Sequence, residues 1–196
     1  MRRMSETSTS LLDRLRLEPD DVAWRRLVDI YTPLIRRWLR RSAAVENDAD
    51  DLVQEVLTVV VRKLPGFRRQ RAGSFRAWLR ASTVNCLRDF LRAGRLRTPA
   101  RGGSELVEML TQLDDPASAL SHVWDEEHDR HVTQHLMQRI KPDFEPTTWR
   151  AFQLLALDGS PAAAVAAELG ISVNAVFIAK SRVLAKLRQE AEGLID

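Results

Sequence analysis

The chain has 196 residues, of which 44% are hydrophobic and 29% charged, with a net charge of +3. This size suits one or two small globular domains. No apolar run approaches the ~20 residues of a membrane span, and the charged N-terminal segment lacks the apolar core of a secretory signal, so we expect a cytoplasmic protein. A single cysteine, Cys86, excludes an internal disulfide.

Charge is distributed unevenly along the chain. Residues 1–100 hold 21 Lys and Arg against 12 Asp and Glu, residues 101–148 hold 4 against 10, and residues 149–196 hold 5 of each. The basic part can bind phosphate, whereas the acidic middle would be repelled by it.

Two helices are predicted before the most informative stretch. Residues 11–17 form a short apolar and basic pattern, and Pro19-Asp20-Asp21 opens the next helix. Pro33 falls inside that second pattern, where it either starts a new helix or kinks the old one. Trp24 and Trp38 are expected to pack in the core.

Residues 48–97 predict two amphipathic helices joined by a short basic loop. The first begins among Asn47, Asp48 and Asp50, which can cap free backbone N–H groups, and ends at Pro65-Gly66. Besides its apolar positions, it carries polar residues at i, i+3, i+4, i+7 and i+11. This polar stripe comprises Asp51, Gln54, Glu55, Thr58 and Arg62.

The second helix of this stretch opens at Gly73-Ser74. Its spacing places Phe75, Leu79, Cys86 and Phe90 on one face. The opposite face carries Arg76, Arg80, Arg88, Arg92 and Arg95. From the residues alone, that arginine face is either solvated or a surface for a polyanion.

The strings DADDLVQEVLTVVVRKLPGF and SFRAWLRASTVNCLRDFLR resemble the second conserved domain of extracytoplasmic-function (ECF) sigma factors, small promoter-recognition subunits of bacterial RNA polymerase in the sigma-70 family. The resemblance implies that Asp51, Gln54 and Glu55 bind the core polymerase. It also implies that residues 68–73 and the start of the following helix capture the opened −10 strand. The implied −10 contacts are Arg68, Arg69, Arg71, Ser74, Phe75, Arg76, Trp78, Arg80, Asn85, Arg88 and Arg92.

Residues 98–115 read as a flexible linker that includes a short transient helix over 104–113. The next predicted helix, residues 117–140, contains all four histidines. Three of them, His128, His131 and His135, share a face near Asp125 and raise the question of a metal site. Zinc sites usually draw ligands from more than one element and no cysteine is nearby, so we expect no metal and no other cofactor.

The C-terminal stretch SPAAAVAAELGISVNAVFIAKSRVLAKLR fits a helix-turn-helix. Ser160 and Pro161 suit a helix start, Gly170 suits the left-handed backbone of a tight turn, and Ser172 can cap the second helix. The core between the two helices would contain Val165, Leu169, Ile171 and Val176. An ordinary helical hairpin is the competing interpretation.

This stretch also resembles the fourth conserved domain of the same sigma factors, which implies recognition of the −35 element. The implied contacts are Ser172, Asn174, Ala175, Phe177, Ile178, Lys180, Ser181, Arg182 and Lys186. One departure matters, because many relatives carry a basic and polar run where this chain has Phe177-Ile178-Ala179. Phe177 and Ile178 either touch a thymine methyl or pack inside.

Together these features predict an all-α sigma factor that binds core RNA polymerase and promoter DNA, directs promoter-specific initiation and is not an enzyme. The expected domains are residues 1–97 (domain 2), a linker at 98–115 and residues 116–196 (domain 4). An anti-sigma factor or other regulatory protein stays open as a further partner, and no membrane is expected. The alternative is a free-standing helix-turn-helix regulator, which would need a symmetric dimer and a palindromic site.

Overall fold

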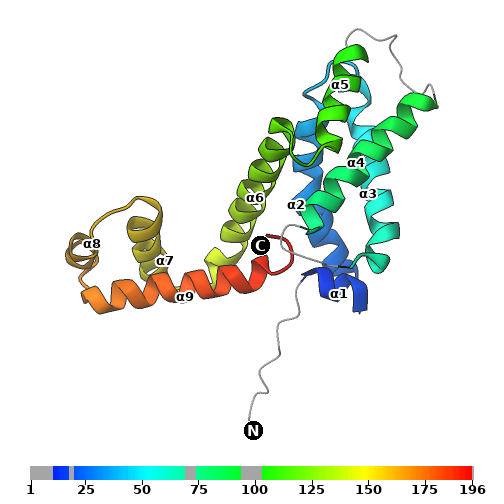
Figure 1. The fold of residues 1–196 in the computed structure, drawn as a ribbon. Coiled ribbons are helices and arrows are strands. Elements are labelled where there is room, and N and C mark those ends of the chain that lie inside the picture. Colours follow the sequence, from blue (N-terminus) through cyan, green and yellow to red (C-terminus); the bar gives the residue numbers. More distant parts are fainter. Residues whose placement is uncertain (1–10, 18–19, 69–73, 94–102, 196) are drawn as a thin grey trace. The chain divides into compact units, whose positions relative to one another are not determined.

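The computed structural model describes residues 11–17, 20–68, 74–93 and 103–195 (Figure 1). These residues form helices joined by short turns, and they contain no β-strand, which confirms the predicted all-α fold class. The α-helices are α1 (Leu11–Leu17), α2 (Asp21–Leu39), α3 (Ala49–Lys63), α4 (Ser74–Arg92), α5 (Gly103–Asp114), α6 (Ala119–Ile140), α7 (Pro146–Phe152), α8 (Ala162–Leu169) and α9 (Val173–Ala191).

The chain divides into two compact units. The first contains residues 1–132 with 193–196, and the second contains residues 133–192, so the division falls within α6. The expected domains, residues 1–97 and 116–196 with a linker at 98–115, stay a prediction, and in this division residues 103–132 belong to the first unit. Most of the described part of the expected linker is α5, whose Leu106, Leu110 and Leu113 are buried. Residues 98–102 of that linker lie outside the described residues.

The first unit is built around α2, α3 and α4, which pack in chain order (Figure 1). The Asp20 side chain accepts a hydrogen bond from the Ala23 N–H at 2.6 Å, so the predicted helix start is confirmed. Pro33 lies inside α2, which continues to Leu39. Trp38 is buried as expected, whereas Trp24 is only half-buried.

Helices α3 and α4 follow the predicted pattern closely. The inner apolar positions of α3 are buried, and the helix ends at Lys63, where a 3₁₀ turn over Leu64–Gly66 that contains Pro65 follows. Asp48 occupies the N-cap position without a side-chain cap hydrogen bond, so this part of the prediction was wrong. On α4 the expected apolar face is buried, comprising Phe75, Leu79, Cys86 and Phe90.

The N-terminal part of α6 completes the core of the first unit. Trp124 is 1% exposed, and its ring lies 4.8 Å from the ring of Trp38 on α2. His128, one helical turn further, is fully buried and stacks on Tyr31 with ring centroids 5.7 Å apart. These apolar and aromatic contacts explain why residues up to 132 belong to this unit.

The second unit contains the predicted helix-turn-helix. Gly170 follows α8 with φ of 64° and ψ of 33°, the left-handed conformation expected of it. The Ser172 hydroxyl accepts from the Ala175 N–H at 3.1 Å and caps α9 as expected. The axes of α8 and α9 meet at 101°, within the range of helix-turn-helix motifs.

The helix-turn-helix has its own small core. Val165, Ala166, Val176 and Ala179 are buried together, and Leu169 and Ile171 pack against them. The predicted N-cap of α8 was wrong by one residue, since Pro161 rather than Ser160 precedes the first residue of the helix. Among the described residues, no single helix has the length and apolar character to cross a membrane, and α8 and α9 pass that test only when taken together across their bend.

Candidate nucleic-acid interface

The polar stripe of α3 is an exposed surface in the structure. All five of its residues are solvent-exposed, while the opposite side of α3 is buried. Thr58 uses its hydroxyl to donate to the Gln54 carbonyl at 2.7 Å. Asp50, just before the stripe, accepts from Arg36 of α2 at 2.7 Å. The three residues expected to bind polymerase, Asp51, Gln54 and Glu55, therefore lie together on one accessible face of the helix.

A basic and aromatic hollow lies where α3 ends and α4 begins. Its volume is about 710 Å³. The residues around it are Arg62, Lys63, Gly66, Phe67, Arg68, Ser74, Ala77 and Trp78. Three of these side chains are cationic and exposed, so phosphate groups would be attracted to the rim of the hollow.

Two aromatic rings, Phe67 and Trp78, line this hollow, and the ring of Phe75 packs against both of them. The Phe67 centroid lies 5.2 Å from Trp78 and 5.6 Å from Phe75. Phe75 is 1% exposed and Phe67 is 8% exposed, so both rings are held by the core. Trp78 is half-buried and presents part of its indole to the hollow. A partly exposed ring beside cations is the combination that binds an unstacked base of single-stranded DNA.

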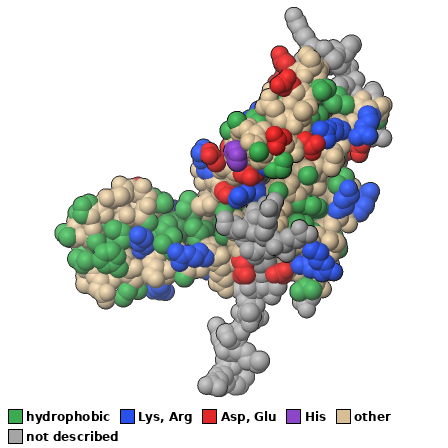
Figure 2. Space-filling view, viewed as in Figure 1, with side chains coloured by type: hydrophobic (Ala, Val, Ile, Leu, Met, Phe, Trp, Pro, Cys, Tyr) green, Lys and Arg blue, Asp and Glu red, His purple; other side chains and the backbone are tan. Residues whose placement is uncertain are grey.

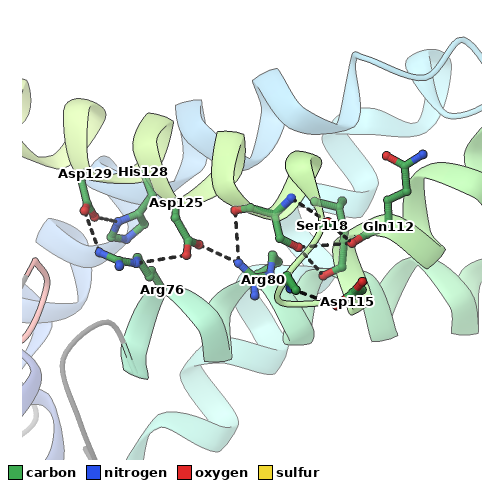
Figure 3. A network of polar contacts seen from close by, with 11 residues as sticks. Arg76, Arg80, Gln112, Asp115, Ser118, Asp125, His128 and Asp129 are labelled. Carbon is green, nitrogen blue, oxygen red and sulfur yellow. Dashed lines mark hydrogen bonds and ion pairs between the residues drawn. The ribbon is translucent and has the colours of Figure 1, made fainter.

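Two arginines of the α4 face, Arg76 and Arg80, pair with carboxylates from α6 (Figure 3). Arg80 donates to Asp125 at 2.6 Å and to the Ser121 carbonyl at 3.4 Å. Arg76 pairs with both Asp125, at 3.4 Å, and Asp129, at 2.7 Å. Because Arg80 is only 5% exposed, its charge is held by this network rather than presented to solvent.

The same network continues to the buried histidine. The His128 Nδ1 lies 2.9 Å from Asp129, and its Nε2 lies 3.3 Å from the Tyr31 hydroxyl. Burial acts to raise the pKa of Asp129, but the His128 hydrogen bond and the Arg76 charge hold the pKa of that carboxyl below its ordinary value. Asp129 is therefore a carboxylate that neutralises Arg76.

Glu127 extends the contact to α2. Its carboxylate lies 2.5 Å from Arg41 and 3.8 Å from Arg37. The Arg41 guanidinium also lies 3.8 Å above the Trp38 ring, a cation–π contact. The acidic middle of the chain thus packs against the basic first part and supplies counter-charges to it. Sequence composition alone suggested that the acidic middle of the chain is repelled by phosphate. The structure adds that these carboxylates pair with arginines.

The histidine face does not form a metal site in the structure. His128 faces Tyr31, and the His131 Nε2 donates to the Ile30 carbonyl at 2.6 Å. Within the described ranges, no group of three or more His, Cys, Asp or Glu side chains could hold a metal ion. Burial lowers the pKa of His131, and it raises that of the Cys86 thiol to about 11. Cys86 is accordingly a small core residue held as the neutral thiol.

Helix α9 presents a mixed polar and apolar outer face. Val176, Ala179 and Val183 are buried on its inner side. The expected −35 residues Asn174, Phe177, Ile178, Ser181 and Arg182 are exposed, whereas Ala175, Lys180 and Lys186 are half-buried. Lys186 pairs with Glu190 at 2.9 Å, and Ser172 is engaged as the N-cap.

Residues 27–97 match the family model of sigma-70 region 2. This match supports a member of the sigma-70 family. No curated protein matches the chain significantly. Sigma-70 region 2 proteins bind core RNA polymerase and act in transcription initiation rather than as enzymes. The matched segment starts within α2 and contains all of α3 and α4, so it includes both the polar stripe and the hollow.

Within the region 2 segment, the structure separates the expected −10 contacts into groups. Arg68, Ser74 and Trp78 line the hollow, and Asn85 is exposed further along α4. Arg88 pairs with Asp114 at 3.0 Å, and Arg92 pairs with Asp89 at 3.2 Å. Arg69 and Arg71 lie outside the described residues.

Two of the expected −10 contacts, Phe75 and Arg80, are buried in the structure. Phe75 is 1% exposed because its ring packs on Tyr31 and Phe67. Arg80 is buried by its pairing with Asp125, and Arg76 shares that carboxylate. Neither Phe75 nor Arg80 is on an accessible surface in this structure, so their role in DNA binding stays a prediction. Helical spacing placed Phe75 and Arg80 on opposite faces of α4, but it did not indicate which segment of the chain covers the arginines.

Three residues that line the hollow, Arg62, Lys63 and Phe67, were not among the DNA contacts expected from the sequence. A signal for them existed in the sequence. Two adjacent cations end α3, and an aromatic residue follows Pro65-Gly66 directly before a run of arginines. Aromatic residues interleaved with basic ones are typical of single-strand binding surfaces.

Proposed function

We propose that this protein is an ECF-type sigma factor that binds core RNA polymerase and directs initiation at promoters with specific −10 and −35 elements. One observation carries the proposal: the segment that matches sigma-70 region 2 presents an exposed acidic and polar stripe beside a basic hollow with an accessible indole. The first surface suits a protein partner, and the second suits single-stranded DNA. We also propose that the protein acts in the cytoplasm, where its polymerase is.

The polar stripe supports a polymerase contact. Asp51 and Glu55 are one helical turn apart, and Gln54 lies between them on the exposed face of α3. Carboxylate and amide groups give directional hydrogen bonds and charge pairing to a basic partner surface without making the free subunit insoluble. These three residues are proposed to dock on the polymerase, as the ECF resemblance implies.

The basic and aromatic hollow supports capture of the opened −10 strand. Arg62, Lys63 and Arg68 would contact phosphates, and Trp78 would stack on an unpaired base. Ser74 begins α4 and lines the hollow, so its hydroxyl group lies at the same place. Secondary candidates for phosphate contact are Arg76, Arg88, Arg92 and Asn85.

The helix-turn-helix supports recognition of the −35 element as duplex DNA. Its recognition helix, α9, enters a major groove by the end that Ser172 caps. Asn174 and Ser181 are exposed and can exchange hydrogen bonds with base edges. Lys180, Arg182 and Lys186 are proposed to contact phosphates or guanine, with Ala175 close to the groove-entering end.

The test is reconstitution with the full chain. Purified protein is mixed with core RNA polymerase, the complex is isolated, and transcripts from a library of bacterial promoter fragments are mapped at their 5′ ends. Co-purification with the polymerase and start sites that share two conserved elements are expected. No complex and no specific transcripts would overturn the proposal. A symmetric dimer that binds a palindromic duplex without polymerase would instead support a free-standing regulator.

A further inference from the structure

The outer face of α9 can be defined from its burial pattern. Val176, Ala179 and Val183 are buried and fix the inner side. At about 100° per residue, Asn174, Ile178 and Ser181 then point the opposite way, and Phe177 lies at the edge of the same face. This outer face is the one that a helix-turn-helix inserts into the major groove.

Two large apolar side chains occupy that outer face. Phe177 is 52% exposed and Ile178 is 49% exposed, and neither packs into the α8–α9 core. The sequence left two possibilities for them, burial or contact with thymine, and the structure excludes burial. Single exposed hydrophobic residues are common, but two neighbours on the outer face of this helix indicate an apolar contact in the bound state.

The charges along α9 indicate what kind of molecule covers this face. The helix carries four cations, Lys180, Arg182, Lys186 and Arg188, against one acid, Glu190. Arg182 and Arg188 are exposed. In Figure 2, hydrophobic and basic side chains lie next to each other over this helix-turn-helix. An apolar strip flanked by arginines is complementary to a groove with phosphates on its sides and an apolar group on its floor.

The major groove offers one such apolar group in unmodified DNA, the C5-methyl group of thymine. We propose that Phe177 and Ile178 read thymine methyl groups in the −35 element, so that this part of its recognition depends on apolar contact. Asn174 and Ser181 supply the neighbouring hydrogen bonds. The inference rests on the proposed function, because it requires that α9 binds promoter DNA.

Deoxyuridine tests this directly, because it pairs like thymine and lacks only the methyl group. Each thymine of a −35 element mapped by the reconstitution is replaced in turn, on each strand. Holoenzyme binding is then measured with the whole chain. One or two positions should lose affinity by about fourfold each, the ratio expected from burying one methyl group. The remaining thymines should be unaffected.

Variants assign the effect to the two side chains. Phe177→Ala and Ile178→Ala should each bind thymine and deoxyuridine equally at one position, while retaining preferences elsewhere in the element. Leu157→Ala is the matched control, since Leu157 is 54% exposed in the same unit but lies outside α9. Because the first readout changes only the DNA, it does not depend on how the variants fold.

The outcomes separate this inference from the proposed function. Initiation that requires the −35 element but does not distinguish thymine from deoxyuridine would overturn the methyl contact and leave the sigma factor assignment intact. A deoxyuridine effect that persists in both alanine variants would also overturn it, because other residues would then read the methyl groups. Absence of any initiation that depends on the −35 element would count against the proposed function itself.

Discussion

The Arg80 guanidinium on α4 donates to Asp125 on α6 at 2.6 Å, and only 5% of the Arg80 side chain is exposed. This pair joins two helices whose residues are 45 positions apart in the chain. Through this pair Arg80, which lies on the expected DNA-binding face of α4, belongs to the core of the first unit. Its environment leads to the first prediction.

Arg80→Ala should lower the free energy of unfolding by about 2–3 kcal/mol, because Asp125 and the Ser121 carbonyl lose a charged donor in a largely buried place. Arg92→Ala is the control. Arg92 is 73% exposed in its pair with Asp89, so its loss should cost less than about 0.5 kcal/mol. Urea unfolding followed by tryptophan fluorescence measures both. Arg80→Ala could instead be as stable as the wild type and show a salt dependence of DNA affinity that is smaller by about one phosphate contact. That combination would show that Arg80 binds DNA.

The polar stripe of α3 gives the second prediction. Asp51→Arg with Glu55→Arg should leave helical content and thermal stability near wild type, since both positions are exposed. Binding to core polymerase should be abolished, because reversed charges at an interface cost several kcal/mol, on the order of a thousandfold in affinity. A pull-down with core polymerase measures this. Glu105→Arg with Glu108→Arg, on exposed positions of α5, is the matched reversal and should still bind. Normal binding by the folded α3 variant would remove the stripe from the polymerase contact.

The hollow beside α4 gives the third prediction. Trp78→Ala should weaken open-complex formation by roughly 5- to 150-fold, the range expected for losing one base-stacking contact of ~1–3 kcal/mol. Binding to core polymerase should be unchanged. Trp78→Phe, which keeps an aromatic face, should restore much of the activity. Permanganate footprinting of unpaired thymines in the −10 region is the measurement. Equal opening by all three proteins would mean that the indole is only a packing residue next to Phe67.

A fourth prediction concerns pH. Burial lowers the pKa of His131 below its ordinary value of 6.5 in the folded state, although the hydrogen bond to the Ile30 carbonyl opposes this. The stabilising effect of neutral His131 is therefore fully present above its ordinary pKa and is lost as the pH falls through the lower folded value. Unfolding free energy should decrease between about pH 7.5 and pH 5.5, and less steeply in His131→Gln. His122→Gln, an exposed position on the same helix, is the control. An unchanged slope in His131→Gln would exclude His131 as the source.

The turn between α8 and α9 gives the fifth prediction. Gly170 has a positive φ of 64°, and a Cβ built there would meet no atom within 4 Å. Gly170→Ala should therefore destabilise the second unit through backbone strain alone, by about 1–2 kcal/mol. Gly170→Asn should cost less, because asparagine tolerates this conformation. Gly66→Ala, at another glycine with open space around it, should be close to neutral. Thermal unfolding followed by circular dichroism measures the unfolding midpoints of Gly170→Ala, Gly170→Asn and Gly66→Ala. Equal midpoints would contradict the expected order of stability.

Much of the fold followed from local chemistry that a sequence carries by itself. The ends of α3 were marked by acidic residues and by Pro65-Gly66, and the exposed stripe by its helical spacing. The helix-turn-helix was predictable because Gly170 and Ser172 have conformational and capping preferences that depend little on the rest of the chain. Periodicity likewise placed Phe75 on the buried face of α4, although the family resemblance suggested a DNA contact.

Tertiary structure alone decided what covers each face. The arginines of α4 looked like a nucleic-acid surface, because helical spacing shows which residues share a side but not which distant segment packs there. The carboxylates that neutralise Arg76 and Arg80 come from α6, and Trp124 and His128 bring the part of that helix up to residue 132 into the first unit. The outward direction of Phe177 was likewise undetermined in the sequence, since an apolar residue at that position satisfies either a core or a groove. Long-range packing resolves such choices because burial and charge pairing depend on contacts between residues far apart in the chain.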